Sequence, residues 1–314
     1  MNAPLLTIVI PCYNEKEVLP ETNRRMVELI GRLINAGKIT SDSQVMYIDD
    51  GSKDNTWDLI KGFSEQSGLI KGIKLSANRG HQTALMAGLF AARGDVVISV
   101  DADLQDDLGA IEQMLDAYRA GNEIVLGVRK QRDVDTIFKR NSAQVYYRLL
   151  SMLGVKVVYN HADYRLLGRR ALDALKQYSE VNLFLRGIVP LLGFKTTTVF
   201  YDRAERFAGE SKYPLRKMLM LALDGITSFT AFPLRLISMM GLAVSVVSAI
   251  MVCWVLWVKL FTNQALPGWA SSVIPIYFLG GIQLLSIGVL GEYVAKIYSE
   301  TKKRPRYFIE ETSG

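Results

Sequence analysis

The chain has 314 residues, of which 49% are hydrophobic and 22% charged, and its formal net charge is +6. This length is enough for one sizeable α/β domain and a further part. Basic residues gather beside apolar segments near the carboxyl end and form no stripe interleaved with aromatic residues, which argues against nucleic acid and favours an anionic membrane surface. The two cysteines, Cys12 and Cys253, fall in a strand-end loop and in an apolar segment, so we expect no disulfide and a reducing cytosol.

Short apolar runs alternate with helical patterns up to about residue 126. The predicted strands are Leu6–Ile10, Val45–Ile48, Ile70–Leu75, Val96–Val100 and Ile124–Leu126, and the segments between them include the predicted helices Val18–Ala36, Thr56–Ser67 and Ala84–Ala92. Strands that alternate with crossover helices form a mostly parallel sheet with helices on both faces. Ligands of such sheets bind outside the carboxyl ends of the strands.

Polar residues follow each of the first four predicted strands. They are Pro11, Tyr13, Asn14 and Glu15 after the first strand, Asp49 and Asp50 after the second, Asn78 after the third, and Asp101, Asp103 and Gln105 after the fourth. Asp49 and Asp50 end a buried strand and suit a uracil N–H or a ribose hydroxyl, although Asp50-Gly51-Ser52 is also a turn sequence and Asp54 a candidate helix cap. His81 and His161 lack metal-ligand spacing, so packing is the expected role of both.

The acidic pair at the end of the fourth strand carries the clearest chemical signal. Asp101 and Asp103 are two residues apart, so their side chains leave the strand on the same side. Two carboxylates that face one point suit Mg²⁺, which takes one or two protein carboxylates and leaves its other positions to water and substrate phosphates. A pair of solvated acids at a strand end is the alternative interpretation.

The ordered set of motifs resembles a known family. The set is Ile10-Pro11-x-Tyr13-Asn14-Glu15, Asp49-Asp50-Gly51-Ser52-x-Asp54-x-Thr56, Asn78-x-Gly80-x3-Ala84 and Asp101-Ala102-Asp103-Leu104-Gln105. It is similar to family 2 glycosyltransferases of the GT-A fold. Within that family the chain looks most like polyisoprenyl-phosphate glycosyltransferases, the dolichyl-phosphate mannose synthases and bacterial bactoprenol glucosyltransferases, over nearly its whole length.

The resemblance assigns further residues. It implies phosphate or acceptor binding by Arg129, Lys139, Arg140, Ser142, Arg165, Arg206, Ser211 and Lys212, the last three from an R-x-x-G-x-S-K loop. It also places Asp163 beside the acceptor, and it implies catalytic roles for Asp103, Asp163 and Arg140. Arginine suits phosphate because its planar fork meets two oxygens and needs no titration. A solvated basic loop ahead of the predicted helix Ala143–Leu153 is the alternative for Lys139 and Arg140.

Two long apolar segments near the carboxyl end predict a membrane anchor. Leu236–Val258 and Leu260–Gly291 are each uncharged and long enough to span a bilayer, and basic residues lie before the first and after the second. We therefore expect both termini in the cytoplasm. The segment Leu215–Phe229 has apolar residues at helical spacing and predicts an interfacial helix, with packing on the sheet as the alternative. A buried hairpin is the alternative for the spans, and Leu5–Ile10 does not predict a signal peptide.

These predictions combine into one hypothesis. We expect a GT-A catalytic domain over residues 1–213, an amphipathic segment over 214–234, a two-helix transmembrane hairpin over 235–298 and a basic cytoplasmic tail over 299–314. The expected reaction is inverting, Mg²⁺- or Mn²⁺-dependent transfer of a sugar, glucose by resemblance, from a UDP-sugar to undecaprenyl phosphate at the bacterial inner membrane, in the service of cell-surface glycan (O-antigen) modification. We also expect the chain to self-associate and to work with a small flippase for the product. We expect no nucleic-acid partner.

Two other functions stay open at this point. A processive polysaccharide synthase of the same fold is one alternative, but its Q-x-x-R-W motif is absent because none of the four tryptophans follows an arginine. A non-catalytic membrane protein that binds nucleotide sugars is the other. It would bind its ligand without turnover.

Overall fold

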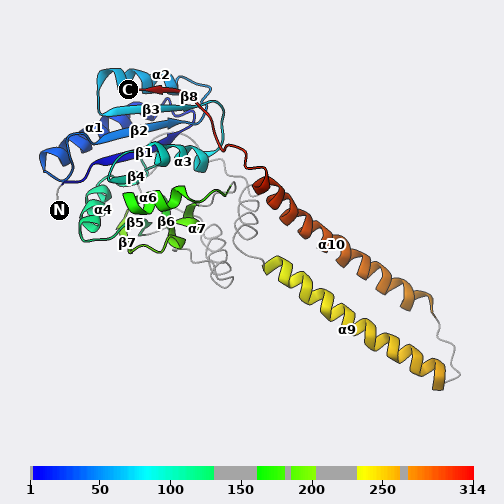
Figure 1. The fold of residues 1–314 in the computed structure, drawn as a ribbon. Helices are drawn as coiled ribbons and strands as arrows, with labels where there is room; N and C mark the ends of the chain where they lie inside the picture. Colours follow the sequence, from blue (N-terminus) through cyan, green and yellow to red (C-terminus); the bar gives the residue numbers. More distant parts are fainter. Residues whose placement is uncertain (1–2, 131–160, 181–184, 203–231, 262–267) are drawn as a thin grey trace. The chain divides into compact units, whose positions relative to one another are not determined.

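The computed structural model describes residues 3–130, 161–180, 185–202, 232–261 and 268–314 (Figure 1). The chain divides into two units, Met1–Leu215 with Lys303–Gly314, and Arg216–Lys302. The first unit is an α/β domain built on one sheet, and the second contributes two long helices.

The sheet of the first unit has eight strands in the order β7-β5-β6-β4-β1-β2-β3-β8. The strands are β1 (Leu6–Cys12), β2 (Gln44–Asp49), β3 (Ile70–Leu75), β4 (Val96–Ser99), β5 (Ile124–Arg129), β6 (His161–Gly168), β7 (Thr196–Tyr201) and β8 (Ile309–Ser313). Strand β6 runs antiparallel to β4 and β5, strand β8 runs antiparallel to β3, and the other pairs are parallel. The predicted mostly parallel sheet is confirmed.

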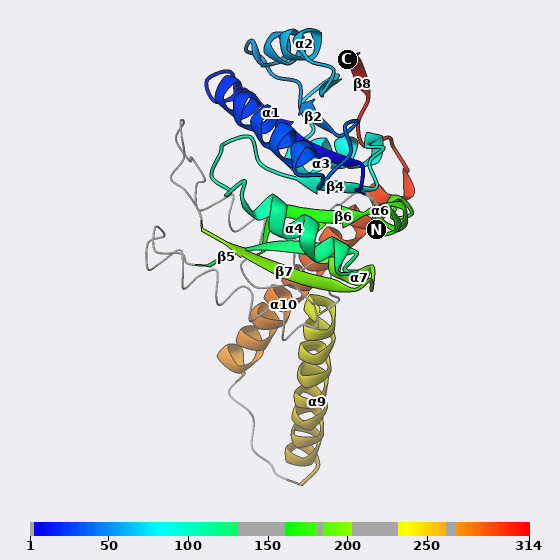
Figure 2. The same cartoon turned by 90° about the vertical axis from the view of Figure 1, so that its left-hand side faces the viewer.

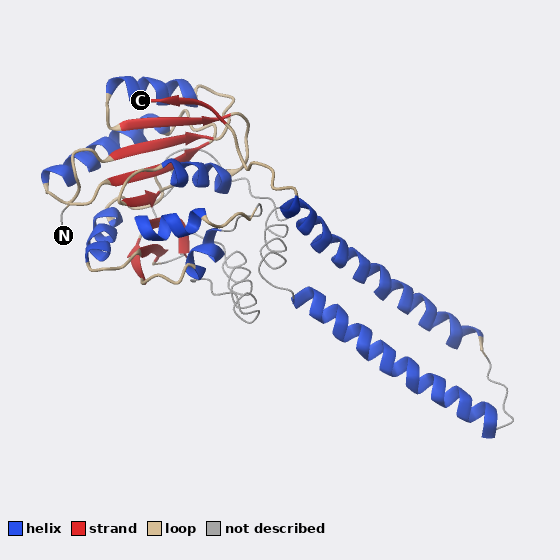
Figure 3. Ribbon diagram, in the orientation of Figure 1, coloured by secondary structure: helices blue, strands red, loops and turns tan. Residues whose placement is uncertain are grey.

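Helices cover both faces of this sheet (Figures 2 and 3). On one face, α1 (Leu19–Asn35), α2 (Thr56–Gln66) and α4 (Ala110–Arg119) share a hydrophobic core with alternate residues of β1. On the other face, α3 (His81–Ala91) approaches β1 so closely that a Cβ at Gly88 would overlap Val9 and Ile48. Helices α6 (Arg169–Lys176) and α7 (Leu185–Leu191) follow β6 in the chain. The close approach of α3 explains why a glycine stands at position 88.

The carboxyl end of the chain differs from the prediction. Residues 299–314 were expected to form a basic tail, but α10 (Trp269–Thr301) runs into that range and β8 then joins the sheet. The register pairs Ile309 with Leu75 and Glu311 with Lys74. The five residues of β8 carry no strong strand pattern of their own, because an edge strand of this kind is defined by its pairing partner rather than by local propensity.

The second unit contains α9 (Phe232–Phe261) and α10. Among the described residues, one helical segment, Phe278–Thr301, is long and apolar enough to cross a membrane by length and composition. The second predicted span begins at Leu260, which the structure instead places in α9. The predicted interfacial segment Leu215–Phe229 lies outside the described residues.

Candidate active site

Hydrogen bonds join the loops that follow β1 and β2 at the carboxyl edge of the sheet. The backbone N–H of Asn14 donates to Ser52 Oγ at 2.9 Å, and the N–H of Lys53 donates back to Asn14 Oδ1 at 2.8 Å. Asn14 has a positive φ of 54°, a conformation that asparagine tolerates better than most residues. The N–H of Glu15 donates to Thr56 Oγ1 at 2.9 Å. These hydrogen bonds therefore hold the two loops together.

Asp49 and Asp50 shape the next loop. Both are buried, and burial raises the pKa of each carboxyl above its ordinary value. Asp50 accepts backbone hydrogen bonds from Arg79 at 2.7 Å and Gly80 at 2.8 Å, one on each oxygen. Asp49 accepts from the N–H of Ser52 at 3.3 Å. Asp50 thus holds the loop that contains the predicted residue Asn78, and its direct contact with a nucleotide stays a prediction.

The remaining residues predicted for the first loop lie at the same edge. Pro11 is buried within β1, and the ring of Tyr13 just beyond it is 41% exposed. An exposed aromatic ring at the carboxyl end of a strand is available to stack on a base. That role for Tyr13 stays a prediction.

The acidic pair, Asp101 and Asp103, begins two residues beyond the end of β4. Burial raises the pKa of Asp101 to about 6, with Asp163, Asp106 and Asp103 adding to the rise and His81 opposing it. Asp103 Oδ1 accepts from the N–H of Gln105 at 3.2 Å, across a turn in which Leu104 has a φ of 56°. Crowded carboxylates of this kind are stabilised by a cation.

The donor set of this turn fits a hard divalent cation. Asp101, Asp103 and Gln105 offer only oxygen ligands from their acceptor groups, which Mg²⁺ and Mn²⁺ prefer. Among the described residues, no group of three or more His, Cys, Asp or Glu side chains is arranged to hold a metal ion. A site with one or two carboxylates therefore needs substrate phosphate and water to complete the coordination.

Asp163 enters the site through the antiparallel pairing of β6. The register pairs Ser99 with Arg165, and two further steps along it bring Asp163 opposite Asp101. Ser99 Oγ donates to the carbonyl oxygen of Asp163 at 2.5 Å, which fixes this crossing. Residues that are distant in the sequence thus meet beside the acidic pair. The place of Asp163 beside the acceptor stays a prediction.

Several donors surround the Asp163 carboxylate. Arg165 Nη2 donates to Oδ1, Arg186 Nη2 donates to Oδ2 at 3.0 Å, and Gln82 Nε2 donates to Oδ2 at 3.4 Å. Burial alone would raise the pKa of Asp163, but Arg186, Arg165 and His81 hold it far below its ordinary value. The carboxylate is therefore ionised and fully engaged at neutral pH.

Two residues of this cluster were missed or misjudged in the sequence. His81 was assigned to packing, yet its Nε2 lies 3.5 Å from Asp101 Oδ1 and 3.8 Å from Asp163 Oδ2. Its place as the first residue of α3, at the carboxyl edge of the sheet, was the available signal. Arg186 was not singled out, because the short helix α7 carries no motif.

Arg165 is placed differently from the prediction of phosphate contact. Its side chain is fully buried within the sheet and contacts Asp163, so the structure makes it a partner of that carboxylate. Arg129, at the carboxyl end of β5, is 25% exposed. It donates to Tyr201 Oη at 3.2 Å and to Asp106 Oδ1 at 3.3 Å. The other predicted phosphate residues, Lys139, Arg140, Ser142, Arg206, Ser211 and Lys212, lie outside the described residues.

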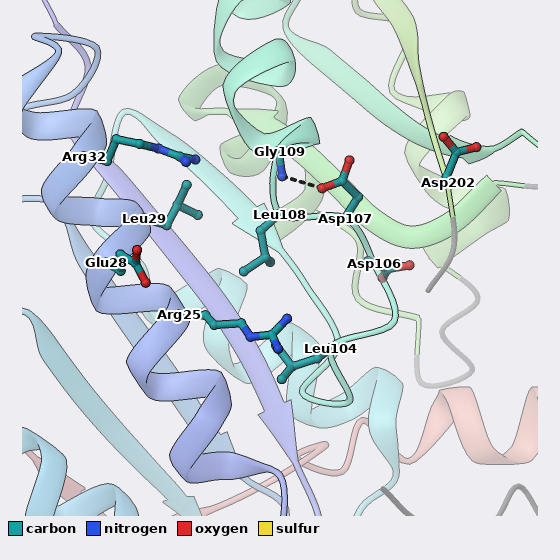
Figure 4. Close-up of a pocket in the computed structure, with 10 residues that line it drawn as sticks. All are labelled: Arg25, Glu28, Leu29, Arg32, Leu104, Asp106, Asp107, Leu108, Gly109 and Asp202. Atoms are coloured by element: carbon teal, nitrogen blue, oxygen red, sulfur yellow. Dashed lines mark hydrogen bonds between the residues drawn. The ribbon is translucent and has the colours of Figure 1, made fainter. Parts of the chain in front are cut away.

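A separate hollow of about 610 Å³ lies between α1 and the loop Leu104–Gly109 (Figure 4). Its lining combines Arg25, Glu28 and Arg32 of α1 with Asp106, Asp107 and Asp202. Asp101 and Asp103 are not among its lining residues. The hollow adjoins the acidic pair through its lining residue Leu104, which directly follows Asp103.

Comparisons with known proteins agree with the fold. The family model described as glycosyl transferase family 2 matches residues 7–176. The uncharacterized glycosyltransferase YkoT of Bacillus subtilis (strain 168) is 50% identical over 313 residues, covering 98% of this chain and 92% of the relative. A prophage bactoprenol glucosyl transferase homolog of Escherichia coli (strain K12) is 38% identical, with 97% and 98% covered. The bactoprenol glucosyl transferase of Shigella phage SfII is also 38% identical, with 98% of each chain covered.

This extent of similarity defines the class of the protein. The chain belongs to glycosyl transferase family 2, and its α/β domain has the GT-A fold that the sequence predicts. It is a glycosyltransferase, and it is similar over nearly its whole length to proteins named bactoprenol glucosyl transferase.

Proposed function

We propose that this chain transfers glucose from UDP-glucose to undecaprenyl phosphate at the cytoplasmic face of a bacterial membrane, with inversion at the anomeric carbon. The observation that carries the proposal is the meeting of Asp101 with the arginine-bound Asp163 at the carboxyl edge of the sheet. Full-length similarity to proteins named bactoprenol glucosyl transferase supports the sugar and the lipid.

The donor would lie over the first three loops. Tyr13, exposed at the end of β1, and the buried Asp49 would meet the nucleoside, while Asp50 keeps the loop Asn78–Gly80 in place for it. Asp101, Asp103 and Gln105 would hold Mg²⁺ or Mn²⁺ beside the diphosphate. A bound divalent ion would supply electrostatic stabilisation of the charge that develops on the departing UDP.

The acceptor needs little activation. A phosphate monoester is anionic at neutral pH, so its oxygen attacks the anomeric carbon as the bond to UDP breaks, and the electron pair leaves with UDP. No enzyme nucleophile takes part, and direct displacement inverts the centre. Asp163 does not serve as a strong base in this proposal, because two arginines hold its pKa far below the ordinary value and its oxygens already accept their hydrogen bonds. Arg129, and Arg140 outside the described residues, would meet phosphate oxygens.

The second unit would anchor the enzyme as a two-helix hairpin, with α9 and α10 as the spans. Connectivity supports an even number of crossings, because the chain leaves the first unit before α9 and returns to it in β8. A folded domain lies on one side of a membrane, so both termini would be cytoplasmic. Residues 1–213 together with β8 would then form the catalytic domain, 214–234 an interfacial segment and 235–298 the hairpin.

The test is a transfer assay with the full-length protein in lipid nanodiscs. Radiolabelled UDP-glucose, Mg²⁺ or Mn²⁺ and undecaprenyl phosphate are supplied, and the organic phase is counted. Label in a monosaccharide-sized lipid product supports the proposal. Label in a polymer would indicate a processive synthase, and bound UDP-glucose without product would indicate a non-catalytic binder. Self-association and a flippase partner remain expectations from the sequence.

A further inference from the structure

The guanidinium of Arg186 is held by two hydrogen bonds to one carboxylate. Its Nη2 donates to Asp163 Oδ2 at 3.0 Å, and its Nε donates to Asp163 Oδ1 at 3.4 Å. A two-point contact of this kind fixes the plane of the guanidinium as well as its position. Arg186 therefore keeps one orientation beside Asp163.

The two arginines that donate to this carboxylate differ in their exposure to solvent. The side chain of Arg165 is fully buried, whereas that of Arg186 is 34% exposed and that of Asp163 is 9% exposed. A ligand at the carboxyl edge can reach Arg186 without any rearrangement of the sheet. Arg165 contacts Asp163 from the buried interior of the domain.

Donor groups gather around the Asp163 carboxylate. Arg165 and Arg186 both donate to it, and within the described residues Nε and Nη1 of the buried Arg165 have no hydrogen-bond partner. His81 links the cluster to the acidic pair, with Nε2 at 3.5 Å from Asp101 and 3.8 Å from Asp163. A phosphate oxygen beside the partly exposed Arg186 would accept a charge-assisted hydrogen bond, which is stronger than a bond between neutral groups.

We propose that Arg186 is a phosphate-binding residue of the active site and that Asp163 is the residue that positions it. The inference rests on the proposed function and deepens it, since it names a group of this chain that meets a substrate phosphate. The phosphate belongs either to the lipid acceptor or to the diphosphate of the donor. Both present the same oxyanion to the fork of Arg186. Asp163 moves no proton in this arrangement.

Steady-state kinetics of the full-length protein in nanodiscs show which of the two substrates presents its phosphate to Arg186. Arg186→Ala is expected to raise the KM for one substrate, undecaprenyl phosphate or UDP-glucose, by about ten- to a hundredfold, the loss expected for a charge-assisted contact. Arg186→Lys keeps the charge without the fork and is expected to fall between the parent and Arg186→Ala. The control is Arg170→Ala, an exposed arginine of α6, with both KM values within about twofold of the parent. Parent-like KM values for both substrates in Arg186→Ala would overturn the inference.

A double-mutant cycle tests the positioning role of Asp163. If Asp163 acts through Arg186, then Asp163→Asn changes the affected KM strongly in the parent and by less than about threefold in the Arg186→Ala background. An equal loss of kcat in both backgrounds would instead make Asp163 a direct participant and overturn its positioning role.

Chemical rescue covers the case in which Asp163→Asn fails to fold because the buried Arg165 loses its partner. Millimolar methylguanidine is expected to restore part of the activity of Arg186→Ala, where Asp163 is intact, and to leave Arg170→Ala unchanged. Absence of rescue together with parent-like KM values would count against a phosphate contact. If the parent enzyme transfers no sugar to lipid phosphate, the proposed function itself is contradicted. If the parent is active and the Arg186 variants match it, only the inference about Arg186 is contradicted.

Discussion

The indole Nε1 of Trp57 donates a 2.8 Å hydrogen bond to Oε2 of Glu311, a residue 254 positions further along the chain. Lys61, one turn beyond Trp57 on α2, donates to the other carboxylate oxygen at 2.8 Å. These contacts attach the last strand to a helix of the catalytic unit. The end of the chain is therefore a structural part of that unit.

Truncation after Phe308 tests the contribution of β8 to stability. Loss of the strand removes its pairing with β3 and exposes Trp57, so the Tm of the protein in detergent is expected to fall by about 5 °C or more. The control is Glu310→Gln, which removes only the exposed pair with Lys74 and is expected to change Tm by about 1 °C at most. Equal Tm values for the truncated and parent proteins would show that β8 adds nothing to the unit.

Asp50→Asn tests the loop that Asp50 holds. An amide has one acceptor oxygen, so it satisfies only one of the N–H groups of Arg79 and Gly80. The affinity for UDP-glucose, measured by calorimetry, is expected to fall by about ten- to a hundredfold. Asp58→Asn, at an exposed position of α2, serves as the control. Parent-like affinity in Asp50→Asn would separate this loop from donor binding.

Asp163→Asn is expected to give a pH-dependent loss of stability. The folded-state pKa of Asp163 lies below its unfolded value, so its stabilisation is present at neutral pH and is lost as the pH falls below about 3.9. Removing one partner of a buried pair costs roughly 3–5 kcal/mol, which lowers Tm by roughly 6–20 °C at pH 7. The difference from the parent narrows towards pH 3. A difference that stays constant over that range, or that Asp173→Asn on α6 reproduces, would contradict the ion-pair account.

Asp103→Asn tests the acidic pair. The substitution keeps the size of the side chain and removes its charge, so turnover is expected to fall by a factor of about a hundred or more. EDTA is expected to abolish the parent activity, and added Mg²⁺ or Mn²⁺ to restore it. Asp107→Asn is the matched control, because within the described part of the chain that exposed carboxylate accepts a single local bond, from the N–H of Gly109. Full activity in EDTA would contradict a metal role.

The proposed hairpin predicts the compartment of two positions. A reporter active only in the cytoplasm is expected to work after Gly314 and to fail near Gly268, between α9 and α10. The reverse pattern would place the catalytic unit away from cytosolic UDP-sugar.

Local patterns predicted the first half of the catalytic unit well. The runs that became β1 to β5 are buried and short, and the polar residues after them meet at one edge because parallel strands share their direction. Asp101 and Asp103 could be singled out for the same reason. The remaining site residues were predicted from the family motifs alone, and their roles stay predictions.

Pairing between distant segments could not be predicted from local patterns. Asp163 meets Asp101 only because β6 is antiparallel to β4, and that same register buries Arg165, which the sequence offered as a phosphate ligand. His81 was dismissed for lack of metal-ligand spacing, although its contacts are carboxylates. β8 was predicted as a tail, because nothing in five mostly polar residues points to β3.

The measurement that tests the central claim most directly is a single-turnover reaction with labelled UDP-glucose and undecaprenyl phosphate, analysed by mass spectrometry of the lipid. The account predicts that each lipid phosphate that reacts gains one glucosyl group, in step with release of UDP, and that Asp103→Asn forms this product at least about a hundredfold more slowly. Free glucose released in step with UDP, or bound UDP-glucose that never gives a glycolipid, would contradict it.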